Sequence, residues 1–456
     1  MRKIALILAM AFAVNVGVAV AQKGVNVVSI NSKIEKADAD AEHVKKGLRG
    51  STWVSRGNAY FESVTIPTRD LFVGLESQLL QMKLGAPKSQ TNEVVNGKEY
   101  TVLEYNYFKV YLAANKVVAW KVTSEIRNDA TDEALKSYAK ALQLESSTSG
   151  SVRNALETMS NHYKQLGNVS MAIGDTKSAA DYFLIVNKVQ QNPGYGKVEP
   201  SILFLAGYML TADGANNVSS FVRGEKALAD ALEAGYSAID DADAQTPAES
   251  KGNIYYYLFH CAYGQRLSNA AKLQDAKKYL LEGNKKYPLN QNIFEGLLTL
   301  YTSEEGLGDP TELLAPIEAK IAKDKNDSGA WFSRGRIYNA LKDTDECIAS
   351  FKMVAQIDPN SFDGNYFLGI FYIQKGDEML NEFNTTTYTD RSKSEEDLAA
   401  MNAVYAMAIP AFEAAHKLKP KDANTLEMLK SLCFRLRDEE GIMDKYTKYN
   451  DLLKSL

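Results

Sequence analysis

The sequence is poor in several residue types that particular classes of protein need. Its 456 residues include 3 cysteines and 4 histidines, and the formal net charge is −5 without any block of basic residues. Three cysteines are too few for a disulfide framework in a chain of this length, and the missing basic block argues against nucleic acid as a partner. Hydrophobic residues make up 45% and charged residues 24%, which excludes a disordered, collagen-like or multi-span membrane protein.

The sequence also lacks the motifs of common catalytic centres. The four histidines are isolated, and none forms the HExxH arrangement of zinc proteases. No Walker loop, no glycine-rich dinucleotide loop after a strand and no G-x-S-x-G elbow is present. We therefore expect no enzyme activity, no cofactor and no metal site. A hydrolase whose paired carboxylates come from distant segments is the alternative that the sequence leaves open.

The first 21 residues have the composition of a secretory signal peptide. Arg2-Lys3 precedes an apolar run over residues 4–13, and Ala19-Val20-Ala21 supplies the small residues of a cleavage site. We expect cleavage after Ala21 and a periplasmic or otherwise exported product, whose net charge changes from −5 to −7 with the loss of the two basic residues. Gln22 stands where a lipoprotein would need cysteine, and no later segment approaches 18 apolar residues, so no integral membrane span is expected.

Export affects the interpretation of the cysteines. Cys261, Cys347 and Cys433 lie far apart and form no C-x-x-C pair. An odd number in an oxidising compartment argues against bridging of all three. We expect buried free thiols, and one disulfide is the alternative.

Two of the three tryptophans begin the same sequence motif. The segment WVSRGNAY at residues 53–60 matches WFSRGRIY at residues 331–338, and Phe351 and Pro359 follow the second copy. The pattern resembles the tetratricopeptide repeat, whose 34-residue unit has W-x2-L-G-x2-Y, then A-x3-F, then P. Arg56 and Arg334 stand where that repeat has leucine.

The repeat continues on both sides of the second copy. Adding 34 to the position of Trp331 gives Asn365, and subtracting 37 and then 34 gives Phe294 and His260. The resemblance implies an all-α fold, a superhelix of tetratricopeptide-type helical hairpins, in which the glycine lets the second helix of a unit approach the first. The residues that define the repeats are Trp53, Gly57, Tyr60, Gly264, Trp331, Gly335, Tyr338, Phe351, Pro359, Gly369, Tyr372, Phe412 and Pro420.

The sequence is expected to consist of four parts. They are a signal peptide over residues 1–21, an N-terminal segment and first repeat helix over 22–65, a small α+β insert over 66–126, and a repeat array over 127–456 with an extended-helix and loop insertion near 378–407. In that last insertion we expect lengthened helices joined by a polar loop over 384–391, with Ser394 capping the second helix. A finger that contacts a partner is the alternative.

The insert near the N-terminus has a mixed pattern. We expect a helix over residues 68–84 and strands over 100–105, 109–112 and 117–122. The order Gly74-Leu75, then Leu84-Gly85-x-Pro87, then strands that end at Trp120, resembles the small SmpA/OmlA-type envelope module, a family associated with outer-membrane protein assembly. The alternative is a structural insert that lengthens one end of the scaffold.

In tetratricopeptide repeats the first helix of each unit lines a concave groove, and the resemblance implies which side chains lie there. The candidates are Phe332, Arg336, Asn339, Tyr366 and Ile370, together with Lys164 and Asn168, which resemble half of a carboxylate clamp. Tyr256 is added because three consecutive tyrosines on a helix cannot all face the core, although such rings can also lie flat between repeats. Apolar side chains with one arginine suit an apolar or amphipathic peptide.

These features predict an exported, non-catalytic scaffold that binds other envelope proteins or peptides in the groove of a tetratricopeptide array. The alternative from another class is a glycan-binding protein of the SusD-like kind, which exposed tyrosines would favour. The repeat-bearing hydrolase is the third hypothesis.

Overall fold

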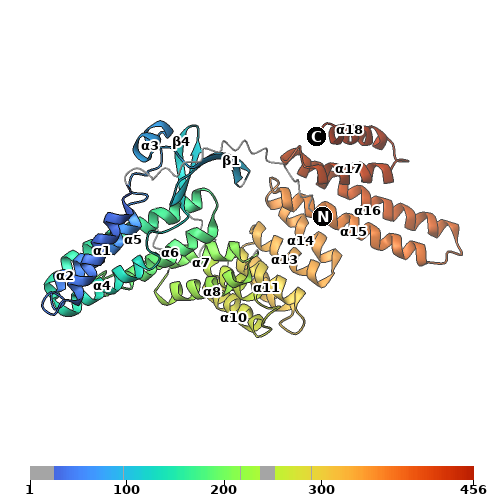
Figure 1. Ribbon diagram of the computed structural model, residues 1–456. Coiled ribbons are helices and arrows are strands. Elements are labelled where there is room, and N and C mark those ends of the chain that lie inside the picture. Colours follow the sequence, from blue (N-terminus) through green and yellow to red (C-terminus); the bar gives the residue numbers. More distant parts are fainter. Residues whose placement is uncertain (1–24, 96, 216, 237–251, 289) are drawn as a thin grey trace. The chain divides into compact units, whose positions relative to one another are not determined.

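The structure is a computed structural model that describes residues 25–95, 97–215, 217–236, 252–288 and 290–456 (Figure 1). The expected signal peptide over residues 1–21 lies outside this range. The chain divides into two compact units, Met1–Ile293 and Phe294–Leu456, and each is described by itself. Both consist of packed pairs of consecutive helices of the tetratricopeptide type, so the expected all-α class with one small sheet near the N-terminus is confirmed.

Unit 1 stacks helices in chain order. The pairs α1–α2, α5–α6, α7–α8 and α9–α10 pack together, and α2 also pairs with α4, across the insert. These helices are α1 (Val27–Glu42), α2 (Gly50–Thr65), α4 (Ala130–Leu144), α5 (Ser149–Ala172), α6 (Thr176–Gln190), α7 (Pro200–Asp213), α8 (Val218–Glu233), α9 (Asn253–Gly264) and α10 (Lys272–Lys286).

The insert consists of α3 (Ser77–Leu84) and a four-stranded antiparallel sheet in the order β1-β2-β3-β4. The strands are β1 (Ser89–Val95), β2 (Lys98–Glu104), β3 (Phe108–Ala113) and β4 (Lys116–Val122), and β4 packs on α5. The expected helix over 68–84 was too long, because Gly74 adopts φ +93° and the helix begins only at Ser77. Strand β1 was missed because its sequence, SQTNEVV, is polar and lies at the sheet edge, where no alternation is needed.

Unit 2 continues the same architecture. Helix pairs α12–α13, α13–α14, α14–α15, α15–α16, α16–α17 and α17–α18 pack in sequence. The helices are α11 (Gln291–Ser303), which begins just before the division, α12 (Leu314–Lys323), α13 (Ser328–Leu341), α14 (Thr344–Ile357), α15 (Phe362–Thr385), α16 (Arg391–Leu418), α17 (Ala423–Arg435) and α18 (Ile442–Lys454).

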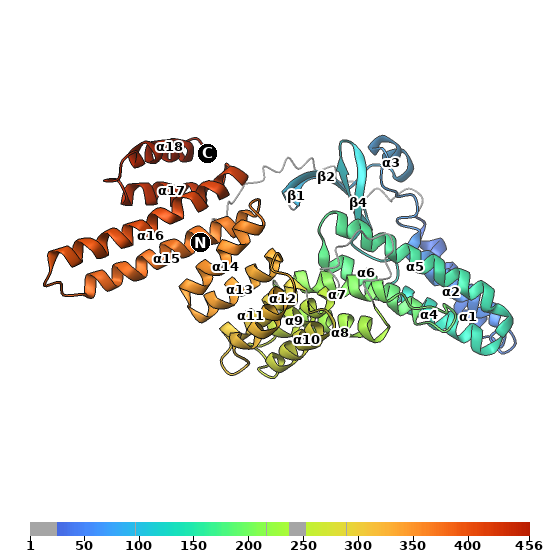
Figure 2. The ribbon, with the colours of Figure 1, turned by 180° about the vertical axis from the view of Figure 1, so that it is seen from behind.

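Helices α15 and α16 are much longer than their neighbours and lie side by side along their length (Figure 2). The loop between them is shorter than expected, because α15 continues to Thr385 and α16 starts at Arg391. The cap of α16 is Asp390, which accepts from the N–H of Ser392, and Ser394 lies inside the helix. Among the described helices, α16 is long and apolar enough to cross a membrane by length and composition alone. Its buried face, which includes Phe412, packs in the unit 2 core.

Short polar turns start the paired helices. Asp327, Asp343 and Asp422 each accept a hydrogen bond from a backbone N–H three residues later, at the starts of α13, α14 and α17. This is the usual way in which a side chain satisfies a free donor at a helix N-terminus. Pro359 and Pro420 each lie two residues beyond the last residue of α14 and α16, where proline prevents continuation of the helix.

Glycines mark the close crossings inside the hairpins. A Cβ atom at Gly335 would lie 2.6 Å from the Phe351 ring, and one at Gly369 would lie 2.6 Å from the Phe412 ring. In the first hairpin Gly57 bears the same relation to Tyr138, at 2.5 Å. Only a residue without a side chain lets the second helix come this near.

Gly264 departs from this arrangement. Its Cα faces the ring of Phe221 on α8, with a Cβ distance of 2.3 Å, rather than a residue of α10. The expectation that Gly264 admits the second helix of its own unit is therefore wrong, and the glycine instead admits the second helix of the preceding pair. Cys261 on the same helix lies 3.1 Å from the hydroxyl of Thr211 on α7 and close to Gly224 on α8, so α9 packs on the preceding pair as well.

His162 on α5 is half-buried and largely enclosed by aromatic rings. Its ring lies edge-on to Phe61 and Tyr163, at centroid distances of 5.9 and 5.3 Å, and its Nε2 is buried without a hydrogen-bond partner among the described residues. Burial lowers the pKa of His162 to about 4. In the unfolded chain histidine has a pKa of about 6.5, so between these two values the unfolded state binds a proton that the folded state does not.

Stability should therefore fall as the pH falls from 6.5 toward 4. At pH 4.5 we expect His162 to lower the free energy of unfolding by about 2–3 kcal/mol relative to pH 7, at about 1.4 kcal/mol per unit of pKa difference. Urea unfolding of the wild type and of His162→Phe at both pH values checks this, because the variant cannot titrate. An equal difference between the two proteins at pH 7 and at pH 4.5 would contradict it.

Candidate functional site

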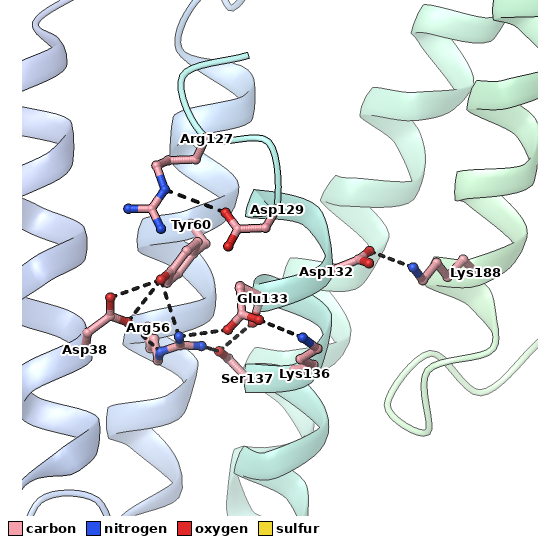
Figure 3. A network of polar contacts seen from close by, with 10 residues as sticks. All are labelled: Asp38, Arg56, Tyr60, Arg127, Asp129, Asp132, Glu133, Lys136, Ser137 and Lys188. Atoms are coloured by element: carbon pink, nitrogen blue, oxygen red, sulfur yellow. Dashed lines mark hydrogen bonds and ion pairs between the residues drawn. The ribbon is translucent and has the colours of Figure 1, made fainter.

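An arginine at the first repeat motif joins three helices of unit 1 (Figure 3). Arg56 on α2 donates from Nε to Asp38 of α1, at 2.7 Å. From Nη2 and Nη1 it donates to Glu133 and Ser137 of α4, both at 2.8 Å. Its guanidinium lies 4.6 Å from the centre of the Tyr60 ring. We call these residues the first arginine cluster.

The carboxylates of the first arginine cluster are ion-paired. Hydrogen bonds from Lys136 and Arg56 hold the pKa of Glu133 below its ordinary value, against the effect of burial. A general acid needs a raised pKa instead. Asp38 and Glu133 do converge from distant segments, as the hydrolase hypothesis requires, but each is ion-paired with the guanidinium that lies between them.

The second repeat motif builds the same arrangement in unit 2. Arg334 on α13 donates from Nε to Glu318 of α12, at 2.7 Å. From Nη2 and Nη1 it donates to Glu346 and Ser350 of α14, at 2.7 and 2.8 Å. Its guanidinium lies 4.5 Å from the ring centre of Tyr338. We call this the second arginine cluster.

The tryptophans that open the two motifs also make matching contacts. Nε1 of Trp53 donates to the carbonyl of Gly47, and Nε1 of Trp331 donates to that of Lys325, both at 2.9 Å and both six residues upstream. Each indole lies 5.7 Å from its arginine. The replacement of leucine by arginine in both motifs thus has a structural explanation, since the arginine pairs with acids from the helices on either side.

The groove candidates of unit 2 lie on α13 and α15 and are half-buried, apart from Asn339, which is exposed. Phe332 and Tyr366 both contact the ring of Phe367, at centroid distances of 5.9 and 6.1 Å, so the structure places them near one another. Arg336 donates from Nη2 to Glu295 of α11, at 3.0 Å. Ile370 packs against the unit 2 core from the same helix as Tyr366.

The groove candidates of unit 1 lie on α5 and α9. Lys164 is paired with Glu199, at 2.7 Å, and its neighbour Asn168 is exposed. Glu199 is the residue before α7, so this lysine already has a carboxylate within the chain. Tyr256 is half-buried, with its ring 4.4 Å from that of His260 and 6.0 Å from that of Tyr257.

Sequence reasoning missed an aromatic surface on α7 and α9. Phe204 stacks on Tyr236 at 4.4 Å and lies beside Tyr208 and Tyr257, and Tyr208 is 38% exposed. Tyr257 in turn lies 5.0 Å from Tyr208. The repeat spacing could have predicted this surface. The other groove candidates were selected as the residue after the tryptophan position and the residue four further on. Counted from Leu203, those two residues are Phe204 and Tyr208.

The described residues contain no group of three or more histidine, cysteine or acidic side chains placed to hold a metal ion. Cys261, Cys347 and Cys433 are free and buried. Burial raises the pKa of the Cys261 and Cys347 thiols to about 12, so neither is poised as a nucleophile.

No protein-family model matches the chain, and no curated protein matches it. Among solved structures, the chain is similar to the C-terminal part of a tetratricopeptide repeat-containing protein from Cytophaga hutchinsonii, with 10% identity, a TM-score of 0.38, and coverage of 64% of this chain and 93% of that one.

Two further solved structures are similar over much of the chain. Human IFIT1, solved as a dimer with m7Gppp-AAAA, is 19% identical with a TM-score of 0.32, and the match covers 70% of this chain and 64% of that one. YrrB, described as a tetratricopeptide protein with an unusual peptide-binding site, is 13% identical with a TM-score of 0.24, and the match covers 64% and 97%. These similarities concern the helical-repeat fold alone.

Proposed function

We propose that this chain is an exported, non-catalytic scaffold that binds other envelope proteins or peptides in the concave groove of its tetratricopeptide array. The observation that carries the proposal is the row of half-buried side chains on the first helices α13 and α15 of unit 2. Phe332, Tyr366 and Ile370 pack on the core from one side and remain partly accessible from the other.

Such a row has the chemistry of a peptide-binding surface. Aromatic and aliphatic anchors supply most of the binding energy at interfaces, and an arginine among them fixes the register of the bound segment. Arg336 is suited to that role because Glu295 orients its guanidinium, which has five N–H donors and uses one of them in this contact. Export rests on the signal-peptide pattern of residues 1–21, and the experiment below tests both parts together.

The test is site-specific photo-crosslinking in the native envelope. A photoreactive benzoylphenylalanine at Asn339, exposed beside the groove row, should yield a protein adduct in the periplasmic or envelope fraction. The matched control places it at Ala349, exposed on the second helix α14. We expect about tenfold more adduct at Asn339, and Ile370→Asp should remove that excess because it places a charge in the groove.

Equal amounts of adduct at Asn339 and Ala349, or an adduct that Ile370→Asp leaves unchanged, would contradict binding in the groove. Recovery of the chain only from the cytoplasm, with residues 1–21 still attached, would overturn export. A thermal melt of Ile370→Asp establishes that the variant is folded under the conditions of the test.

A second candidate function, glycan binding, is favoured by the aromatic surface of Phe204, Tyr208, Tyr236 and Tyr257. Aromatic faces are common platforms for ligands that present an apolar side. A glycan array followed by calorimetry separates the two functions. Saturable binding that Tyr208→Ala abolishes would support the glycan hypothesis, and no binding to any glycan would exclude it.

A further inference from the structure

The repeat that follows the second arginine cluster has the same spacing but different residues. Glu318 and Trp331 are 13 positions apart, and so are Lys352 and Asn365. Leu368 and Tyr372 then stand where the cluster has Arg334 and Tyr338. On the following helix, Met407 and Ala411 lie five and one residues before Phe412, as Glu346 and Ser350 lie before Phe351.

Asn365 retains the hydrogen bond of the tryptophan but not its ring. Its Nδ2 donates to the carbonyl of Pro359, six residues upstream, at 3.1 Å. Trp53 and Trp331 make the corresponding bond from Nε1, also to a carbonyl six residues upstream. The backbone geometry of the position is therefore kept, and the volume of an indole is absent.

A pocket lies where that ring and its arginine would be. It has a volume of about 380 Å³ and lies among α14, α15 and α16. Its lining residues are Lys352, Ala355, Gln356, Asn365, Leu368, Tyr372, Met407, Pro410 and Ala411. Pockets that hold ligands in proteins have volumes of this order and mostly apolar walls.

The charge of the pocket is opposite to that of the filled clusters. Lys352 replaces the acid Glu318, and Met407 replaces the acid Glu346, so the lining contains one cation and no carboxylate. No ion pair is formed by Lys352 within the described part of the chain, and its side chain is exposed. Met407 on the opposite wall is 50% exposed.

We infer that this pocket binds an aromatic side chain of a protein partner that is flanked by acidic residues. The ring fills the space that Trp331 and Arg334 fill in the preceding hairpin, against Leu368 and Tyr372, and a carboxylate beside it pairs with Lys352. The site lies on another face of α15 than Tyr366 and Ile370, so it is independent of the groove proposed above.

Filling the pocket from within provides the central test. In Asn365→Trp the new indole can make the hydrogen bond to Pro359 that Trp331 makes to Lys325, and we expect the thermal midpoint to rise by about 2–4 °C. Calorimetry with the capped peptide Gly-Glu-Trp-Glu-Gly should show saturable binding to the wild-type chain. Binding to Asn365→Trp should be at least about tenfold weaker, and the same peptide with alanine in place of tryptophan should not bind.

Reversal of the charge provides the second test. Lys352→Glu should lower affinity for the Glu-Trp-Glu peptide about tenfold and raise affinity for a Lys-Trp-Lys peptide. Lys454→Glu, an exposed lysine at the end of α18, is the matched control and should change neither affinity.

Three results would overturn the inference. They are no binding of the Glu-Trp-Glu peptide to the wild-type chain, undiminished binding to a folded Asn365→Trp, and equal effects of Lys352→Glu and Lys454→Glu. Binding lost in Ile370→Asp but kept in Asn365→Trp would assign the peptide to the groove and overturn the pocket while supporting the proposed function.

Discussion

Replacement of Phe351 by alanine is expected to lower the free energy of unfolding by about 3–5 kcal/mol. The side chain is fully buried, and its ring packs against Phe332, Phe367 and Phe371 at centroid distances of 5.3–5.4 Å. It also covers Gly335 on the paired helix. The loss combines the burial free energy of the phenyl ring, which the variant no longer gains, with the cost of the cavity left among the three surrounding rings.

The matched control is Phe434→Ala on α17, whose ring is 53% exposed. We expect that change to cost less than about 1 kcal/mol, because most of the ring is already in water. Chemical unfolding followed by circular dichroism measures both variants. Similar losses for the two would show that Phe351 is not a central packing residue of unit 2.

Replacement of Arg56 by leucine should cost about 2–3 kcal/mol, although leucine is the residue usual at this repeat position. Leucine replaces the aliphatic part of the arginine but leaves Asp38 and Glu133 without the cation that they share. The arginine side chain is only 13% exposed in this site. Removal of one partner from a fully buried ion pair costs about 3–5 kcal/mol, and the partial exposure of the two acids places the expected loss below that.

Two further variants separate charge from packing. Arg391→Leu removes an arginine that is 92% exposed and paired with Glu395 on its own helix, and it should cost no more than about 0.5 kcal/mol. Adding Glu133→Gln to Arg56→Leu should restore part of the loss, because it removes one of the two uncompensated charges. If the double variant is less stable than Arg56→Leu, the electrostatic account is wrong.

The pairing of helices followed from the spacing of large and small residues. A glycine four positions after tryptophan, followed by a large ring on the next helix, predicts that the two helices cross closely at the glycine. Gly335 and Phe351 have that geometry. This signal is local in sequence and depends on volume alone, which is why it was readable without coordinates.

The contacts that could not be predicted from the sequence join residues that are far apart in it. Arg56 meets Glu133 across 77 positions, whereas Arg334 meets Glu346 across 12, so only the second pairing is close enough to suggest itself from the sequence. The misplaced partner of Gly264 has a similar origin, because its neighbour is Phe221 of α8, which lies 43 positions upstream.

The groove candidates illustrate the same limit. The repeat register predicted their helices, but the degree of exposure depends on neighbours from other helices, such as Phe367 of α15 against Phe332 of α13. The pocket beside Asn365 was even less accessible to sequence reasoning. It is marked only by one hydrogen bond, which Trp53, Trp331 and Asn365 each make to a carbonyl six residues upstream.

The sheet between α2 and α4 also has a mechanical consequence. It is inserted in the first hairpin, yet β4 rests on α5, and Lys121 of that strand pairs with Asp175, which caps α6 of the next hairpin. An array of helical repeats bends through small rotations between adjacent units. At this joint such a rotation would pull the sheet from its support, so under tension the first two hairpins should move as one stiff segment while the later joints of unit 1 yield first.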